Sequence, residues 1–243
     1  MAVDYSDLSR TFDRTRSSPE DVRGFWLPEL ARVGDVRPGR SVLDVGCGTG
    51  RLSVPLSEGC RVVGIDPTAE MLAIARSKGG RADFVRADAA RIPFGADRFD
   101  VAIAVLVLHL VPDLSAAVRE IARVARRAVV ATVDMQRRRR HAIDEAFPSL
   151  QGIDEARFPR IGDLRAACRE AGLPRVEVTE ATRRVESPTA EFLERVRGRY
   201  ISTLALLPPG EFGRGLEWLE ATLPARGPRY AYEHTVTFVV ASR

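Results

Sequence analysis

The sequence predicts an α/β domain with a doubly wound, mostly parallel β-sheet. Strand-like and helix-like segments alternate along most of the 243 residues and are joined by short turns. The run Val101–Leu108 is apolar at every position, which is typical of a strand buried on both faces within a parallel sheet. In Val42–Gly50, an apolar strand ends in three glycines at alternate positions and a helical pattern follows.

The elements can be placed in order from the N-terminus. Ser18 and Pro19 supply a capping hydroxyl and a proline at the first helical position, so a helix is expected from there to about Val33. Asp113 can cap a helix whose apolar residues repeat at helical spacing as far as Val124. The other expected helices are 50–58, 68–77 and 161–171, and the expected strands are 41–45, 61–65, 82–86, 101–108, 128–133, 175–184 and 230–240.

Two stretches, 135–160 and 186–228, interrupt this alternation and are expected to form lids or substrate walls. The second is long enough for two helices, one starting at Ser187 and Pro188 and one after Gly210. Its surroundings are rich in aromatic residues, which either wall a ligand or form the core of the lid: Tyr200, Phe212, Trp218 and Tyr232. The whole chain, 1–243, is expected to be a single domain.

Composition narrows the class of protein. No stretch approaches the roughly 20 apolar residues that span a bilayer, and the N-terminus lacks the basic start and apolar region of a secretion signal. Cys47, Cys60 and Cys168 show no Cys-x-x-Cys spacing, which argues against a disulfide framework and against a zinc site. We therefore expect a cytoplasmic protein with no metal and no membrane partner.

The four consecutive arginines Arg137–Arg140 are the sharpest charge feature in a chain with 37 basic and 33 acidic residues. They can anchor a phosphate or carboxylate, or they can form a solvated loop or helix start. We favour the second interpretation because arginine is abundant throughout the chain.

The residues around the glycine turn indicate which ligand it holds. Asp66 closes the second strand, where a carboxylate can accept hydrogen bonds from a ribose diol, and Asp88 follows the third, where it can accept from an exocyclic amine. A nicotinamide dinucleotide remains possible, but the glycine spacing and Arg51 count against it. Asp44 lies inside the strand, where an ionised group is costly unless a ligand's amino group is its partner. A P-loop is excluded because Gly-Lys-Ser/Thr is absent.

At these residues the chain resembles class I S-adenosylmethionine-dependent methyltransferases, in the small-molecule branch that includes the ubiquinone and menaquinone methyltransferases. The matching segments occur in order over roughly 40–134: Val42–Gly50, Gly64–Pro67 with Met71 and Leu72 following, Asp88–Phe94, and Phe99–Asp100 through Leu108–Asp113. The resemblance implies a Rossmann-like methyltransferase fold, with a seven-stranded sheet whose last strand is antiparallel. It also implies S-adenosylmethionine as the cofactor and S-adenosylhomocysteine as the product.

The resemblance further implies the residues that bind the cofactor. The glycine-turn residues Gly46, Cys47, Gly48 and Gly50 would face its methionine and ribose parts, and Asp44 would lie near its amino group. On the nucleoside side, Asp66 would bind the ribose, Pro67 and Met71 would lie near the adenine, and Asp88 and Ala89 would bind the adenine edge. Leu106 would lie near the sulfonium.

The N-terminal residues 1–35 are expected to form a helical segment that covers the cofactor. Within it, Phe12–Arg16 resembles the family's closing segment, with Phe12 where relatives often have tyrosine. Arg16 is a candidate partner for the methionine carboxylate, because a guanidinium fork suits that group.

Methyl transfer needs alignment of donor and acceptor, and a base when the nucleophile carries a proton. His109 is the candidate base, with a histidine satisfied by a backbone carbonyl as the alternative. His234 is expected in the core and His141 at the surface. The chain has no Asn/Asp-Pro-Pro-Tyr after the fourth strand and no Pro-Cys pair, which favours a small acceptor over nucleic acid.

Three functions are open on the sequence. The favoured one is transfer of a methyl group to an O, N or C nucleophile of a small molecule by a monomer or homodimer. A tRNA or protein methyltransferase that docks through Arg137–Arg140 is the second. A non-catalytic module that binds the cofactor is the third.

Overall fold

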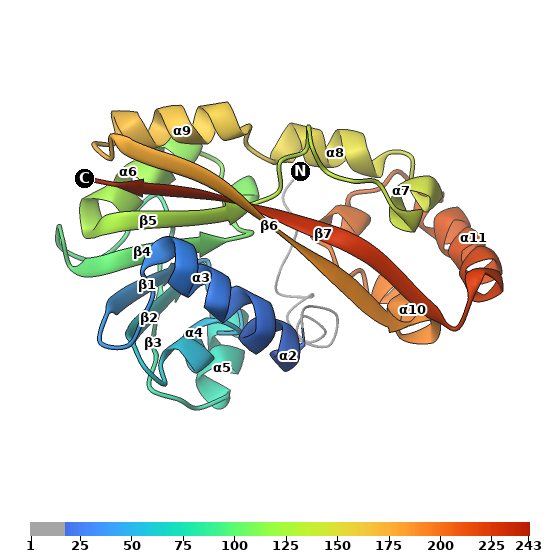
Figure 1. The fold of residues 1–243 in the computed structure, drawn as a ribbon, viewed down its shortest axis with the longest axis horizontal. Coiled ribbons are helices and arrows are strands. Elements are labelled where there is room, and N and C mark those ends of the chain that lie inside the picture. Colours follow the sequence, from blue (N-terminus) through green and yellow to red (C-terminus); the bar gives the residue numbers. More distant parts are fainter. Residues whose placement is uncertain (1–17) are drawn as a thin grey trace.

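The computed structural model describes residues 18–243, which form an α/β structure around one seven-stranded sheet (Figure 1). The predicted closing segment Phe12–Arg16, including the candidate ligand Arg16, lies outside the described residues. Between residues 18 and 243, no helix is both long enough and apolar enough to cross a membrane.

The sheet has the order β3-β2-β1-β4-β5-β7-β6. Its first five strands are parallel, and β7 is antiparallel to both of its neighbours. The strands are β1 (Ser41–Val45), β2 (Arg61–Asp66), β3 (Asp83–Arg86), β4 (Phe99–Val105), β5 (Ala125–Thr132), β6 (Arg175–Pro188) and β7 (Arg229–Ser242). The predicted doubly wound, mostly parallel sheet with an antiparallel last strand is confirmed. The strand order reverses at β1, so the glycine turn lies at the switch point where such sheets bind ligands.

The helices are interspersed between the strands. They are α2 (Pro19–Asp21), the π-helical η1 (Val22–Trp26), α3 (Leu27–Gly34), α4 (Ser53–Leu56), α5 (Ala69–Ser77), the 3₁₀ turn η2 (Leu108–Leu110), α6 (Leu114–Val124), α7 (Ala142–Ala146), α8 (Leu150–Arg157), α9 (Ile161–Glu170), α10 (Thr189–Arg197), η3 (Ser202–Ala205) and α11 (Glu211–Arg226). Both predicted helix caps are present. Ser18 Oγ accepts from the Asp21 backbone N–H at 3.2 Å, and Asp113 Oδ1 accepts from that of Ala116 at 2.8 Å.

Two predicted elements are shorter in the structure than expected. The helix predicted at 50–58 is α4, which begins only at Ser53, because Gly50 keeps a positive φ of 72° and prolongs the turn. The strand predicted at 101–108 ends at Val105, because Leu106 adopts a positive φ of 51° that breaks the extended backbone. In both cases backbone geometry at the ligand-binding edge overrides the apolar pattern.

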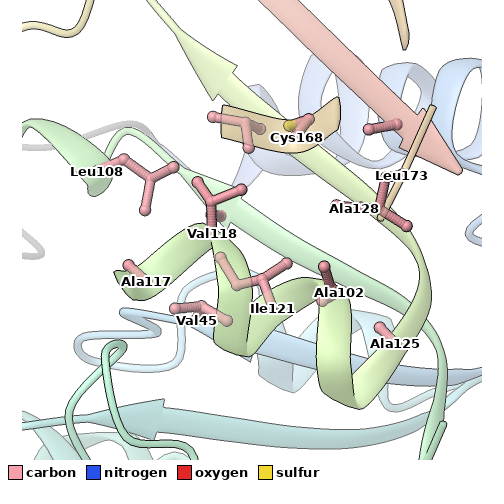
Figure 2. Packing of buried hydrophobic residues seen from close by; sticks show 14 of the residues in the cluster. Val45, Ala102, Leu108, Ala117, Val118, Ile121, Ala125, Ala128, Cys168 and Leu173 are labelled. Atoms are coloured by element: carbon pink, nitrogen blue, oxygen red, sulfur yellow. The ribbon is translucent and has the colours of Figure 1, made fainter. Parts of the chain in front are cut away.

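Two hydrophobic cores cover the two faces of the sheet. On one face α6 and α9 pack on the central strands, and Figure 2 shows Val118 and Ile121 of α6 close to Ala102 of β4 and Ala128 of β5. On the other face Trp26 and Leu30, from η1 and α3, join the apolar side chains of β1, β4, β5 and β7. Burial of each large apolar side chain stabilises the fold by about 1.5–3 kcal/mol. This rigid frame positions the loops at the carboxyl ends of the parallel strands.

A third core belongs to a helical cap, which we define as residues 142–157 and 189–226. Its helices α7, α8, α10 and α11 gather at one end of the long β6–β7 hairpin (Figure 1) and enclose Phe147, Phe192 and Leu219. The cap arises from the two stretches that interrupt the predicted alternation. Their role as lid or substrate insertions, and the treatment of 1–243 as one domain, stay predictions.

Candidate functional site

A cavity of about 600 Å³ lies between the carboxyl ends of the parallel strands and the cap. This volume falls in the range of roughly 300–1,000 Å³ typical of small-molecule sites. One wall, the glycine-turn wall, consists of residues at the carboxyl ends of β1 to β4 and in the segments that follow them: Asp44, Gly46, Cys47, Gly48, Arg51, Asp66, Pro67, Thr68, Met71, Ala87, Asp88, Ala89 and Leu106. The opposite wall, the distal wall, comes from β6, β7 and the cap: Arg157, Arg183, Arg195, Tyr200, Ile201, Ser202, Tyr232 and His234. Trp26 and His109 also line the cavity.

The glycine turn brings bare backbone to the cavity. The backbone N–H groups of Gly46 and Cys47 both donate to the Ile65 carbonyl, at 2.8 and 2.9 Å, which ties the turn to β2. Gly46 has a φ of 68°, and a Cβ built on it would lie 2.2 Å from Val107 Cγ2. No other residue type fits there without displacement of Val107. Glycine at this position therefore lets the turn pack against Val107 while its backbone lines the cavity.

Gly50, predicted with the other glycines to face the ligand, does not line the cavity. A Cβ at Gly50 would lie 3.0 Å from both Ala75 Cβ and Phe84 Cζ. Its missing side chain serves the close packing of the turn against α5 and β3. A contact of Gly50 with the cofactor stays a prediction.

Asp66 carries a carboxylate that the main chain holds in place. Its Oδ2 accepts from the Gly48 backbone N–H at 3.0 Å, and its Oδ1 accepts from that of Thr68 at 2.8 Å. The residue is 9% exposed and lines the cavity, with Pro67 and Met71 beside it. Each carboxylate oxygen keeps a second lone pair, so the group can still accept two hydrogen bonds from a diol.

Asp88 and Ala89 line the cavity beyond the end of β3. Asp88 Oδ1 accepts from the Ala90 backbone N–H at 2.8 Å, so a local turn orients the side chain. The Asp88 residue is exposed, unlike Asp66. The arrangement places a second hydrogen-bond acceptor on the same wall, next to a backbone segment.

Asp44 is the buried carboxylate of the wall, 3% exposed at the end of β1. Ser53 Oγ donates to its Oδ2 at 2.6 Å. Burial raises the pKa of Asp44 to about 6, while the hydrogen bond from Ser53 and the charge of Arg51 act in the opposite direction. An ionised Asp44 is thus incompletely compensated by the protein, and a cationic ligand group at this end of the cavity would relieve that cost.

Leu106 lies where β4 reaches the cavity, in a left-handed conformation that is unusual for a residue with a branched side chain. Its backbone N–H donates to the Ala131 carbonyl at 2.8 Å, which holds the strained turn against β5. Backbone strain of this kind concentrates at functional sites. No pattern in the sequence signalled it.

His109 lies in the 3₁₀ turn η2 and lines the cavity as expected. Its ring stacks on Phe158, with centroids 4.1 Å apart and planes 8° apart, and this contact restricts its orientation. Its role as a base stays a prediction. Burial raises the pKa of the Cys47 thiol far above its usual value, so the thiol is protonated and contributes an apolar surface.

The distal wall contains the residues that sequence reasoning missed: Arg157, Arg183, Arg195, Ile201 and Ser202. They come from α8, β6, α10 and the segment before η3, which lie far apart in the sequence. No local motif marks them, because only the tertiary structure brings these elements together. The alternation of β7 is the one usable signal, since Tyr232 and His234 share one face of that strand.

The two other histidines differ from expectation. His234, expected in the core, is packed inside but lines the cavity, and burial lowers its pKa to about 4. His141, expected at the surface, is packed: its ring stacks on Tyr232 at 4.4 Å, and its Nδ1 lies 3.0 Å from Tyr230 Oη. The prediction that His141 lies exposed at the surface is wrong. His141 forms a capping box with Asp144 at the start of α7, and its ring turns inward.

The aromatic residues considered as walls fall into two groups. Tyr200 and Tyr232 line the cavity. Phe212 instead stacks on Phe147 in the cap core at 6.0 Å, and Trp218 lies at the surface, 37% exposed. Cap core and cavity wall share the same residue types, so composition alone did not separate them.

The arginine run is largely engaged within the protein. Arg137 pairs with Glu180 at 2.8 Å, Arg138 with the buried Asp144, and Arg139 with Glu233. The side chains of Arg137 and Arg139 are 70% and 72% exposed. This agrees with the interpretation of a solvated loop that is braced by ion pairs. In the described part of the chain, no group of three or more His, Cys, Asp or Glu residues is placed to hold a metal ion.

Fold and cavity together define a class of protein. A sheet with this strand order, a glycine turn at its switch point, and carboxylates near the ends of β1, β2 and β3 are features that this chain shares with class I S-adenosylmethionine-dependent methyltransferases. Residues 43–131 match the family model described as a methyltransferase domain. This part of the chain is therefore similar to methyltransferase domains, in agreement with the resemblance seen in the sequence.

Individual relatives agree with this class. The malonyl-[acyl-carrier protein] O-methyltransferase of Serratia marcescens is 31% identical over 127 residues, 52% of this chain and 48% of that protein. A demethylmenaquinone methyltransferase of Bacillus cereus is 31% identical over 110 residues, 42% of this chain and 46% of that protein. The crystal structure of a "Putative methyltransferase from antibiotic biosynthesis pathway" of Anabaena variabilis superposes with a TM-score of 0.76 at 20% identity, over 95% of this chain and 100% of that one.

The matches cover only part of the curated relatives, and the structural match has a low sequence identity. The chain spans about half the length, or less, of the first curated relatives that it matches. The crystal structure, at 20% identity, shows the common fold alone. The acceptor has to be inferred from this chain's own residues.

Proposed function

We propose that this protein transfers the methyl group of S-adenosylmethionine to an O, N or C nucleophile of a small-molecule acceptor. One observation carries the proposal: the glycine turn, Asp44, Asp66 and Asp88 line one wall of a single cavity whose opposite wall is also formed by protein. The methyltransferase domain and the relatives named for small or carrier-bound acceptors support it.

The residues of the glycine-turn wall fit this cofactor. Asp66 is preset by two backbone N–H groups to accept from the ribose hydroxyls, and Asp88 is placed to accept from the adenine amine. Asp44 has the incompletely compensated charge that an ammonium group would complement. Gly46 has no Cβ to meet Val107, which lets the turn keep its left-handed conformation beside the cavity. When bound, the cofactor supplies an activated methyl group on its sulfonium.

The protein aligns the methyl donor with the acceptor, keeps water away from them and supplies a group that can accept a proton. The distal wall lies across the cavity from the glycine-turn wall, and Trp26 lines the cavity beside Arg51. His109, fixed against Phe158, is the proposed base for an acceptor that carries a proton. The pKa of Tyr200 and that of Tyr232 are raised, first of all by burial, so both phenols stay protonated and act as donors or apolar walls.

Docking of tRNA or protein through Arg137–Arg140 is not favoured. Three of the four guanidinium groups are paired with carboxylates of this chain, and each pair would have to break before a phosphate could bind. The cavity has a volume suited to small molecules, as given above.

Cofactor binding is tested by calorimetry with S-adenosylhomocysteine. Asp66→Ala removes a carboxylate that accepts charge-assisted hydrogen bonds worth about 1.5–3 kcal/mol, so affinity should fall roughly 10- to 100-fold. Asp163→Ala, at an exposed carboxylate on α9, is the matched control and should bind as the wild type does. Equal affinities for Asp66→Ala and wild type would show that the cofactor site is misassigned.

Catalysis is tested separately by transfer of a labelled methyl group from S-adenosylmethionine to a library of small acceptors. Transfer of the labelled methyl group to any acceptor would exclude the hypothesis of a non-catalytic module. Binding of the cofactor without transfer to any acceptor would favour that module, and loss of binding would contradict both.

A further inference from the structure

The two walls of the cavity carry opposite charges. The glycine-turn wall holds three aspartates and one arginine, Arg51, whereas the distal wall holds three arginines and no acidic lining residue. Arg183 pairs with Asp21, and Arg157 lies 3.9 Å from Asp154. The aspartates line the wall assigned to the proposed cofactor, and the arginines line the other wall of the same cavity.

Arg183 is held rigidly at this wall. One end of its guanidinium pairs with Asp21, and the group lies over the ring of Phe25, 4.9 Å from the centroid. The side chain is only 14% exposed. Its Nε is buried and has no hydrogen-bond partner among residues 18–243. Nε–H is a donor only, and a buried unpaired donor costs about 1–3 kcal/mol, so an acceptor atom brought to this group would stabilise it.

His234 lies directly opposite Arg183 in the β6–β7 ladder, so both side chains are on the same face of the hairpin. Its Nδ1 is also buried and has no partner within the described chain. Burial and the nearby Arg183 lower the pKa of His234 to about 4, so the ring is neutral at pH 7 and can donate one N–H. Two unsatisfied nitrogen atoms on cross-strand neighbours can share one oxygen-rich ligand group.

Arg195 and two tyrosines complete this part of the wall. The Arg195 guanidinium lies over the ring of Tyr200, 5.0 Å from its centroid, and it also contacts Tyr232. The phenol rings and Ile201 supply flat and apolar surface. The wall therefore combines cationic donors with surface suited to a ring or an apolar chain.

We propose that the methyl acceptor is a small organic acid, whose carboxylate binds Arg183, His234 and Arg195 while its apolar or aromatic body lies against Tyr200, Tyr232 and Ile201. A carboxylate supplies the acceptor oxygens that Arg183 Nε and His234 Nδ1 lack, and it balances the positive charge of the wall. A neutral acceptor of the same shape would leave part of that charge buried and uncompensated. This inference rests on the proposed function and names its substrate class.

The test uses the full chain saturated with S-adenosylhomocysteine. Binding is measured by ligand-observed NMR for matched triplets of carboxylic acid, primary amide and methyl ester on phenyl, hydroxyphenyl, naphthyl and cyclohexyl scaffolds. We expect acids to bind at least about tenfold more tightly than their amides and esters, and the preference to fall below about threefold in Arg183→Gln and in Arg195→Gln. Arg183→Lys keeps the charge but not the Nε donor, so it should retain part of the preference.

Arg184→Gln is the matched control, because Arg184 is the next residue of β6 and is exposed on the opposite face. It should keep the full preference for acids. Melting temperature and affinity for S-adenosylhomocysteine establish that each variant is folded. Amides that bind as well as acids, no bound member of the set, or an equal loss in Arg184→Gln would overturn the inference while leaving the cofactor assignment intact. Failure of S-adenosylhomocysteine to bind the wild type would instead overturn the proposed function.

Discussion

The two walls of the cavity are built in different ways. The glycine-turn wall consists of loops that directly follow consecutive parallel strands, and its polar groups are oriented largely by backbone N–H groups close to them. The distal wall takes side chains from a hairpin and three cap segments, and side-chain contacts such as Arg183 with Asp21 and Phe25 orient it. Main-chain geometry restricts the first wall to one kind of ligand. The second depends on long side chains, which substitution can change without disturbing the fold.

The largest effect is expected where the main chain itself meets the ligand. Gly46→Ala adds a Cβ that would lie 2.2 Å from Val107, in a backbone conformation that disfavours side chains. The free energy of unfolding should fall by about 2–5 kcal/mol, from the strained φ and the clash together. Affinity for S-adenosylhomocysteine should fall at least about tenfold, measured by calorimetry on the folded fraction.

Gly39→Ala separates the effect of the strained φ from the effect of the clash with a neighbouring side chain. Gly39 also has a positive φ, 87°, but a Cβ there meets nothing within 4 Å. This variant should lose only about 1–2 kcal/mol of stability and keep its affinity for the ligand. If Gly46→Ala behaved as Gly39→Ala does, the proposed dependence of the site on the contact between the turn and Val107 would be refuted.

A smaller effect, specific to the glycine-turn wall, is expected from pH. Asp44 has a pKa raised to about 6, and an ammonium group bound beside it favours the ionised form. The affinity for S-adenosylhomocysteine should therefore rise as the pH rises through 6, and it should be roughly tenfold lower at pH 5 than at pH 8. The stability of the ligand-free protein should change with pH in the opposite direction. Because the folded state raises the pKa of Asp44, its contribution to the free energy of unfolding is lost as the pH rises from about 4 to about 6.

Asp44→Asn is the control for this pH profile. It should bind more weakly at pH 8 and show a flatter profile between pH 5 and pH 8, measured by calorimetry at constant ionic strength. The pKa values of His141 and His234, each about 4, lie below this range and do not contribute to the slope. A slope that persists unchanged in Asp44→Asn would assign the titration to another group.

The smallest effect is expected at the arginine run, which belongs to neither wall. The double substitution Arg137→Gln and Arg139→Gln breaks two exposed ion pairs, each worth about 0.2–1 kcal/mol. Methyl transfer to a small acceptor should not change, and binding to tRNA in a filter assay should be as weak as for the wild type. A marked loss of salt-dependent tRNA binding would instead revive the docking hypothesis.

Much of the glycine-turn wall could be predicted because its residues stand in short segments next to predictable strands. Asp66 ends β2 and Asp88 follows β3, and parallel strands end at the same edge of a sheet. The differences from expectation on this side concern conformation: Gly50 prolongs the turn before α4, and Leu106 ends β4 by adopting a left-handed backbone. Apolar periodicity contains no information on φ at a single residue.

The sequence by itself determined the α/β class, the strand order at the turn and the carboxylates that face the proposed cofactor. Local patterns of the sequence specify these features. The alternation of strands and helices, and the glycines of a tight turn, can each be recognised within a short segment. Tertiary structure alone decided the distal wall. Arg183 faces His234 through the register of a hairpin whose strands lie 40 residues apart along the chain, between Pro188 and Arg229, and Arg195 reaches them from a separate helix. Such contacts depend on how the cap folds over the sheet, and no short segment of the chain specifies that.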